Sequence, residues 1–194
     1  MPPDSLANWN GTPAEKKDLL DVARHSIFAG ARGLEYAPPA SCDPRLREPW
    51  GAFVTLRQRR RLRGCMGQLP SRSALIEVVA HCAKSAALED PRFEALRPEE
   101  TSQVAIEISV LSPLEKITLQ QIEIGRHGLL VRRAHLRGVL LPQVATEFRW
   151  DATKFLEETC HKAGLDRQAW READTEIQAF SVTVFREEEW AAKL

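Results

Sequence analysis

Two patterns of hydrophobic residues, one alternating and one helical, indicate a chain built from short helices and strands. The clearest strand covers residues 104–111, in which every second side chain is aliphatic: Val104, Ile106, Ile108 and Val110. Successive side chains of a strand point to opposite faces, so these four should share a buried face. Residues 72–88 repeat hydrophobic side chains at helical spacing, and Cys82 belongs to that stripe.

Two further helices are marked by the residues at their ends. Thr12-Pro13-Ala14-Glu15 combines an N-cap hydroxyl, a proline in the first turn and a glutamate placed to reach back to the cap. Glycines 30 and 33 should end this helix. Asp151 is placed to cap another helix, and Gly164 is placed to end it.

The remaining hydrophobic segments predict strands joined mostly by hairpins. Residues 50–56 and 62–66 should pair across the basic turn at 57–61. Further strands are expected at 122–124, 129–132, 138–141 and 177–185. Regular strand-helix-strand alternation is missing, so the pattern favours an α+β fold with an antiparallel sheet over a parallel one. We expect a domain at 14–187, preceded by an N-terminal extension at 1–13 and followed by a charged tail at 188–194.

Composition and charge narrow the class of partner. The 194 residues include 27 Lys and Arg and 27 Asp and Glu, so no net positive field draws the whole chain to nucleic acid. The run at 57–63 is the only strong basic segment, and at a hairpin tip it is most simply a solvated turn.

The cysteines and the remaining motifs predict neither a metal site nor a cofactor. The cysteines at 42, 65, 82 and 160 form no CxxC pair and no cluster at zinc-site spacing. Phosphate-binding loops, dinucleotide fingerprints and serine-hydrolase elbows are missing from the sequence. Because it shows neither a signal peptide nor a membrane span, we expect a cytoplasmic protein with reduced thiols and no membrane partner.

The stretch LRGCMG at 62–67 carries the first candidate site. Arg63 could bind an anionic group, and Cys65 could act as a nucleophile or redox thiol if positive charge and backbone N–H groups favour its thiolate. Gly64 and Gly67 would let a ligand approach the backbone. The alternative is an inert, buried Cys65 beside glycines that only relieve crowding.

Four further residues could complete such a site. His127, between two glycines at a strand turn, could move a proton near neutral pH, or it could be an exposed turn residue. Glu107 could line a cleft or face solvent from an antiparallel sheet. Arg92 in the DPRF turn could bind a carboxylate or phosphate bidentately. Gln143 could present its amide to a ligand.

Seven ordered strings resemble the AMMECR-one domain family over about residues 14 to 187. They are GAFVTL at 51–56, LRGCMG at 62–67, DPRF at 90–93, EISVLSP at 107–113, HGLLV at 127–131, LLPQVA at 140–145 and CHKAGL at 160–165. The resemblance implies an antiparallel sheet packed with helices and a smaller lobe forming a cleft. It also implies partners, because the prokaryotic domain is encoded beside a Memo-like protein and a radical-SAM enzyme.

This chain departs from the family pattern at three places. Met66 replaces the isoleucine of the family's LRGCIG hallmark, an exchange of similar bulk. Arg60 or Arg61 stands where a glycine commonly precedes the hallmark, and Ala134-His135-Leu136 lacks the usual glycines of its turn. The extra arginines could give this chain a more basic rim.

Three functions are compatible with these residues. The favoured one is a ligand-binding or accessory subunit, acting with the Memo-like and radical-SAM partners on a small anionic ligand. The second is an independent small-molecule enzyme that uses Cys65, with His127 or Glu107 moving protons. The third is a nucleic-acid-binding module, which the zero net charge does not favour.

Overall fold

The computed structural model describes residues 6, 8–40 and 43–187, which form two compact units. Over the described residues, we call Trp9–Leu111 with Thr183–Glu187 the larger unit, and Ser112–Val182 with Leu6 and Asn8 the smaller unit. The predicted tail at 188–194 lies outside the described residues, and so do residues 1–5 and 7 of the predicted extension at 1–13. Residues 6 and 8–12 of that extension form no helix or strand. The domain boundaries therefore stay a prediction.

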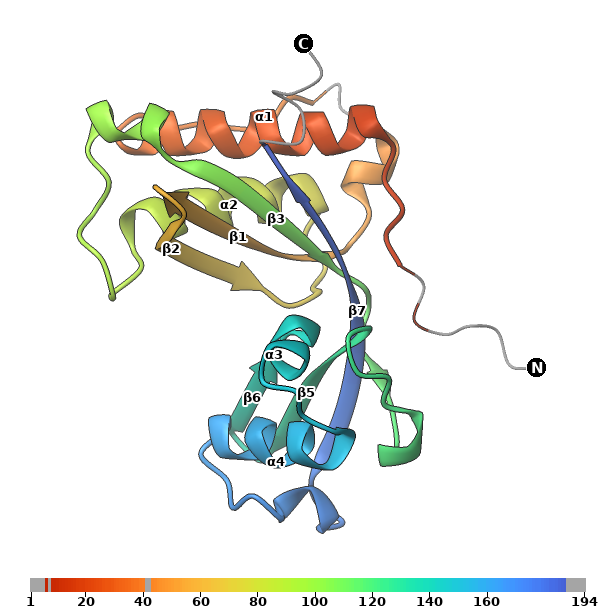
Figure 1. Ribbon diagram of the computed structural model, residues 1–194. Coiled ribbons are helices and arrows are strands. Elements are labelled where there is room, and N and C mark those ends of the chain that lie inside the picture. The colour runs from red at the N-terminus through yellow and green to blue at the C-terminus, as the bar shows by residue number, and fades with distance from the viewer. Residues whose placement is uncertain (1–5, 7, 41–42, 188–194) are drawn as a thin grey trace. The chain divides into compact units, whose positions relative to one another are not determined.

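The larger unit is an antiparallel sheet covered by two helices (Figure 1). Its strands β1 (Gly51–Gln58), β2 (Arg61–Gln68) and β3 (Ala105–Leu111) lie in the order β2-β1-β3, and the end of β7 (Glu176–Arg186) follows β3. Helix α2 (Leu75–Leu88) packs against β1 and β2, and α1 (Pro13–Gly30) packs against α2. Two short 3₁₀ segments, η1 (Pro44–Arg47) and η2 (Pro98–Gln103), complete the unit.

One face of this sheet forms the core with the helices, and we call it the core face. It carries the aliphatic side chains of β1 and β3, which are buried: Ala52, Val54, Leu56, Ile106, Ile108 and Val110. The alternation predicted for residues 104–111 is thereby confirmed. The residues between them point to the other face, as the two-residue period of a strand requires.

The smaller unit has its own antiparallel sheet and its own core. Strand β5 (His127–Arg133) pairs with β6 (Leu136–Leu140) and with β7, and the short β4 (Glu115–Lys116) also pairs with β7. The helices of this unit are α3 (Pro142–Glu147) and α4 (Ala152–Lys162), with 3₁₀ turns η3 (Leu119–Gln121) and η4 (Ala169–Arg171). Helix α4 packs on β5 and β6 through buried side chains such as Phe155 and Leu156.

The helix-end predictions are confirmed in detail. The Thr12 hydroxyl accepts a hydrogen bond from the Glu15 backbone N–H at 3.2 Å, and Glu15 accepts one from the Thr12 N–H at 2.5 Å. Asp151 caps α4 by accepting from the Lys154 N–H at 2.7 Å. Gly164 follows α4 with a φ of 78°, the left-handed backbone that glycine adopts without strain.

Two expectations were wrong. Residues 122–124 form no strand: they follow the 3₁₀ turn η3, which Ile122 caps through a hydrogen bond from its backbone N–H to the Leu119 carbonyl. Helix α2 begins at Leu75 rather than Arg72, because the chain is still irregular after β2. The segment Pro142–Glu147 forms a further helix, α3, which the sequence patterns did not predict, with proline at its first position.

The fold class itself is as predicted, α+β, with β1 antiparallel to β2 and β3, and with β7 antiparallel to β4 and β5 and β5 antiparallel to β6. Within those residues, no helix combines the length and the hydrophobicity needed to cross a membrane.

Candidate functional site

A row of polar side chains crosses the sheet of the larger unit on the side opposite the core face. Thr55 of β1 lies directly between Cys65 of β2 and Glu107 of β3 in the register of the three strands. Directly paired residues of an antiparallel sheet share a face and lie close together. We call the face that carries Thr55, Cys65 and Glu107 the polar face. All three residues are half-buried, so each can still contact a ligand.

Each member of the row has a defined partner. The Thr55 hydroxyl donates to the Cys65 sulfur, with 3.3 Å between Oγ1 and Sγ. The Glu107 carboxylate accepts from the Arg186 guanidinium of β7 at 2.5 Å. The row therefore ends in an ion pair on one side and in a thiol on the other.

Beside this row, the outer edge of β2 is closed by a buried carboxylate. The Asp90 carboxylate accepts a hydrogen bond from the Cys65 backbone N–H at 2.8 Å. The Arg92 guanidinium donates to both oxygens of Asp90, at 2.9 and 2.7 Å, and to the Cys65 carbonyl at 3.4 Å. These hydrogen bonds, above all those from Arg92, hold the pKa of Asp90 well below its ordinary value. The pair replaces the neighbouring strand that an edge strand lacks.

Arg92 was expected to bind a ligand, and the structure shows what it already binds. Its two donors to Asp90 form the bidentate geometry that was predicted for a carboxylate, but the carboxylate belongs to the chain. Its side chain remains about half exposed, so a ligand role stays a prediction.

The two glycines of LRGCMG are needed where other atoms come close. A Cβ on Gly64 would lie 2.0 Å from the Ala86 carbonyl oxygen, so the missing side chain lets α2 approach β2. A Cβ on Gly67 would lie 2.1 Å from the Phe53 ring on the neighbouring strand. Close packing explains both glycines without a ligand.

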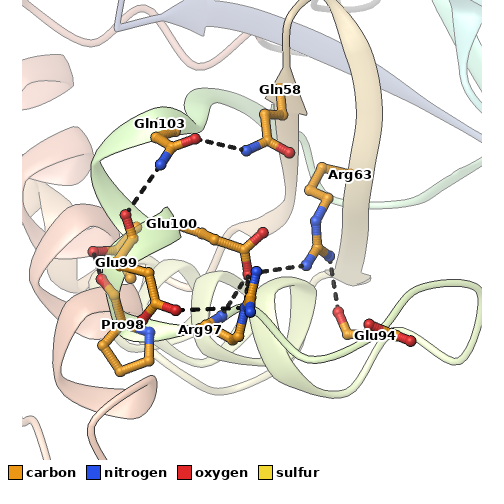
Figure 2. A network of polar contacts seen from close by, with 9 residues as sticks. Gln58, Arg63, Glu94, Arg97, Pro98, Glu99, Glu100 and Gln103 are labelled. Carbon is orange, nitrogen blue, oxygen red and sulfur yellow. Dashed lines mark hydrogen bonds and ion pairs between the residues drawn. The ribbon is translucent and has the colours of Figure 1, made fainter.

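Arg63 is held by the residues that follow α2 (Figure 2). Its guanidinium donates to the Glu94 carbonyl at 2.9 Å and lies 3.9 Å from the Glu100 carboxylate. In the same network Gln58 of β1 donates to Gln103 at 3.3 Å. These contacts tie the hairpin to η2, so Arg63 would have to exchange them to bind an anion.

His127 and Gln143, the other predicted site residues, belong to the smaller unit. His127 is only 4% exposed, so the alternative of a solvent-exposed turn histidine is wrong. Its Nδ1 lies 3.1 Å from the Glu123 backbone N–H, which donates to it. Gln143 lies at the start of α3 and is exposed. The structure thus brings Cys65 and Glu107 onto one face, with Arg63 and Arg92 along β2, and assigns these two residues to the other unit.

The other described cysteines are poor nucleophiles. Burial raises the pKa of the Cys82 thiol to about 12, and burial also raises the pKa of Cys160. Cys65, Cys82 and Cys160 are all free thiols. Where the structure is described, it contains no group of three His, Cys, Asp or Glu side chains arranged to hold a metal.

Sequence reasoning missed three members of the arrangement. Thr55 was assigned to a strand without a role, because its partner Cys65 becomes a neighbour only through the hairpin register. Asp90 precedes the arginine that was singled out, and its burial could not be read from the sequence. Arg186 lies at the end of β7, where nothing in the sequence links it to Glu107.

The comparisons with known proteins agree with one another. The AMMECR1 family model matches residues 20–185. A protein of Thermococcus gammatolerans is 40% identical over 182 residues, which cover 88% of this chain and 89% of that protein. A protein of Methanopyrus kandleri is 41% identical over 191 residues, covering 92% and 91% respectively.

A solved structure extends the likeness to the fold. The crystal structure of the uncharacterized protein PH0010 from Pyrococcus horikoshii matches with a TM-score of 0.85 and 36% identity, over 93% of this chain and 95% of that one. Sequence and structure lead to one conclusion: the chain belongs to the AMMECR1 family.

Proposed function

We propose that the chain is a ligand-binding accessory subunit, which uses the polar face of the larger unit and acts with a Memo-like protein and a radical-SAM enzyme. The partners come from the family resemblance. The polar row of Cys65, Thr55 and Glu107 is the observation that carries the ligand-binding role. We also propose that the protein is cytoplasmic, where reducing conditions keep thiols such as those of its described cysteines free.

The contacts of the row favour binding over independent catalysis. A catalytic thiol needs a base within hydrogen-bond reach that takes its proton. The Cys65 sulfur accepts a hydrogen bond from the Thr55 hydroxyl and interacts with the Arg92 guanidinium, and neither group is a base. Glu107 is engaged by Arg186. His127, the other predicted proton carrier, is buried within the smaller unit. Hydroxyl, thiol and carboxylate side by side instead offer donors and acceptors to a bound polar molecule.

Thiol reactivity separates this role from the enzyme alternative. Iodoacetamide should alkylate Cys65 no faster than it alkylates glutathione at neutral pH, because only an activated thiol reacts faster than an ordinary one. Cys82 should stay unmodified, since burial raises its pKa to about 12. Mass spectrometry of the two peptides gives both rates. Alkylation of Cys65 much faster than that of glutathione would favour the enzyme.

The accessory role requires a direct complex. Titration calorimetry of the purified chain with a Memo-like protein from the same genome should show saturable binding. A Glu107→Ala variant should bind less tightly if the polar face takes part, whereas Glu172→Gln, an exposed change in the smaller unit, should bind normally. An absence of binding at up to about 100 μM would reject a stable complex of the two proteins.

A further inference from the structure

The tip of the β1–β2 hairpin borders a hollow of about 430 Å³ within the larger unit. Arg57, Arg59 and Arg60 line it from the hairpin, and Gln103, Glu107 and Arg186 line it from η2, β3 and β7. A volume of this size suits a small molecule, because pockets for such ligands usually measure about 300–1,000 Å³. Glu107 joins the hollow to the polar face.

Positive charge dominates the lining of this hollow. Four guanidinium groups face one carboxylate, and the ion pair with Arg186 already occupies that carboxylate. The side chains of Arg57, Arg59 and Arg60 make no hydrogen bond or ion pair with any described residue. Like charges that gather around one hollow repel one another, so an anion between them would relieve the repulsion.

The turn itself is built against the usual preference. Gln58 pairs with Arg61, so Arg59 and Arg60 form a two-residue hairpin turn with φ values of 50° and 65°. Asparagine and glycine are favoured at such positions, because other side chains are strained at positive φ. Arginine at both positions gives up backbone stability and places two guanidinium groups on the hollow.

We propose that this hollow binds a small molecule carrying a phosphate or diphosphate group. Such a molecule would be the ligand of the polar face. The inference rests on the proposed ligand-binding function and names its ligand. Guanidinium forks match phosphate oxygens bidentately, and several arginines can share one diphosphate. A nucleic acid would need a longer basic stripe, whereas the hollow is compact and the chain has no net charge.

Inorganic pyrophosphate is the probe that tests this assignment. Calorimetry at low, fixed salt should show one saturable site on the full chain, with weaker binding of inorganic phosphate. The variant Arg59→Asn/Arg60→Gly should bind pyrophosphate about tenfold more weakly, or worse, as loss of one or more charge-assisted hydrogen bonds produces. This variant should fold, because asparagine-glycine is the preferred pair for this turn.

A matched variant controls for overall charge. Arg61→Gln/Arg72→Gln removes two positive charges from exposed positions that do not line the hollow, and it should bind pyrophosphate within about twofold of the unmodified chain. Equal weakening in both double variants would overturn the proposal, because it would reveal general charge attraction. Failure of the unmodified chain to bind pyrophosphate would overturn it as well.

Two further arms separate the related ideas. Single-stranded RNA that binds more tightly than pyrophosphate, and loses affinity equally in both double variants, would assign the arginines to nucleic acid instead. Complex formation with the Memo-like protein is measured on the same variants. If that complex forms while pyrophosphate does not bind, the ligand class is wrong and the accessory role stands.

Discussion

At the scale of single residues, Gly64 decides how closely a strand and a helix can approach. An added Cβ would lie 2.0 Å from the Ala86 carbonyl oxygen, which is backbone and cannot rotate away. Gly64→Ala should therefore push α2 from β2 and lower the free energy of unfolding by about 1–3 kcal/mol. Urea denaturation followed by circular dichroism measures this change.

Gly30→Ala is the matched control for that substitution. An added Cβ at Gly30 would meet flexible side chains, Leu88 Cδ1 and Lys84 Cγ, each at 3.1 Å. Alanine also favours the helical backbone of α1 more than glycine does, so this variant should keep or slightly raise stability. If both alanine variants behaved alike, the close approach at Gly64 would not be the cause.

At the scale of elements, the edge of β2 depends on Asp90. Asp90→Asn removes the charge that holds Arg92 and weakens the acceptor of the Cys65 N–H. We expect the free energy of unfolding to fall by about 1–3 kcal/mol and hydrogen exchange at the Cys65 amide to become faster, because the buried Asp90 carboxylate makes charge-assisted hydrogen bonds. Exchange at Cys65 should be unchanged in Glu89→Gln, an exposed neighbour bonded to Ser85. An unchanged Cys65 amide in Asp90→Asn would contradict the clamp.

The hairpin turn gives a second prediction at this scale. Left-handed backbone costs a residue with a side chain roughly 1–2 kcal/mol. Replacing Arg59 and Arg60 by Asn and Gly should therefore raise the urea midpoint, even though it removes two surface charges. Arg61→Gln, in the strand beside the turn, should leave the midpoint nearly unchanged. A lower midpoint in the Asn-Gly variant would show that the arginines stabilise the turn by contacts of their own.

At the scale of the whole molecule, both units should lose stability in acid. Arg167 and Lys154 lower the pKa of Glu158 in the smaller unit from 4.5 to about 2, and Arg92 lowers the pKa of Asp90 in the larger unit. As pH falls below about 4.5, these carboxylates bind protons in the unfolded chain while they stay ionised in the folded chain. The stabilisation from Glu158 is present above that pH and is lost as pH falls toward 2.

Urea midpoints at about pH 6 and about pH 3 measure this linkage. The unmodified chain should have the lower midpoint at pH 3. The urea midpoint of Glu158→Gln should fall less between the two pH values, because this variant lacks one of the carboxylates that titrate. The midpoint of Asp90→Asn should also fall less. A midpoint that did not change with pH would refute the assignment of these carboxylates.

Much of the local structure could be predicted because its causes are local. The capping box at Thr12 and Glu15 and the cap at Asp151 act within one helical turn, so neighbouring residues specify them. The alternation of residues 104–111 likewise reports one buried face. Residues 122–124 were mispredicted because two aliphatic side chains do not by themselves specify a strand: Ile122 is half-buried at the end of a 3₁₀ turn, and Ile124 is exposed.

The candidate site depended on contacts between distant residues. LRGCMG could be identified as unusual, and its place on a hairpin arm could be predicted, since β-branched residues and a turn mark the hairpin. Which side chains meet Cys65 was decided by register across three strands, by the buried Asp90 that follows a helix, and by the end of β7. Register and helix docking are set by packing across the whole unit, which no local segment of the sequence specifies. The sequence alone therefore determined the elements and the family resemblance, and the tertiary structure decided which of the polar residues form a site.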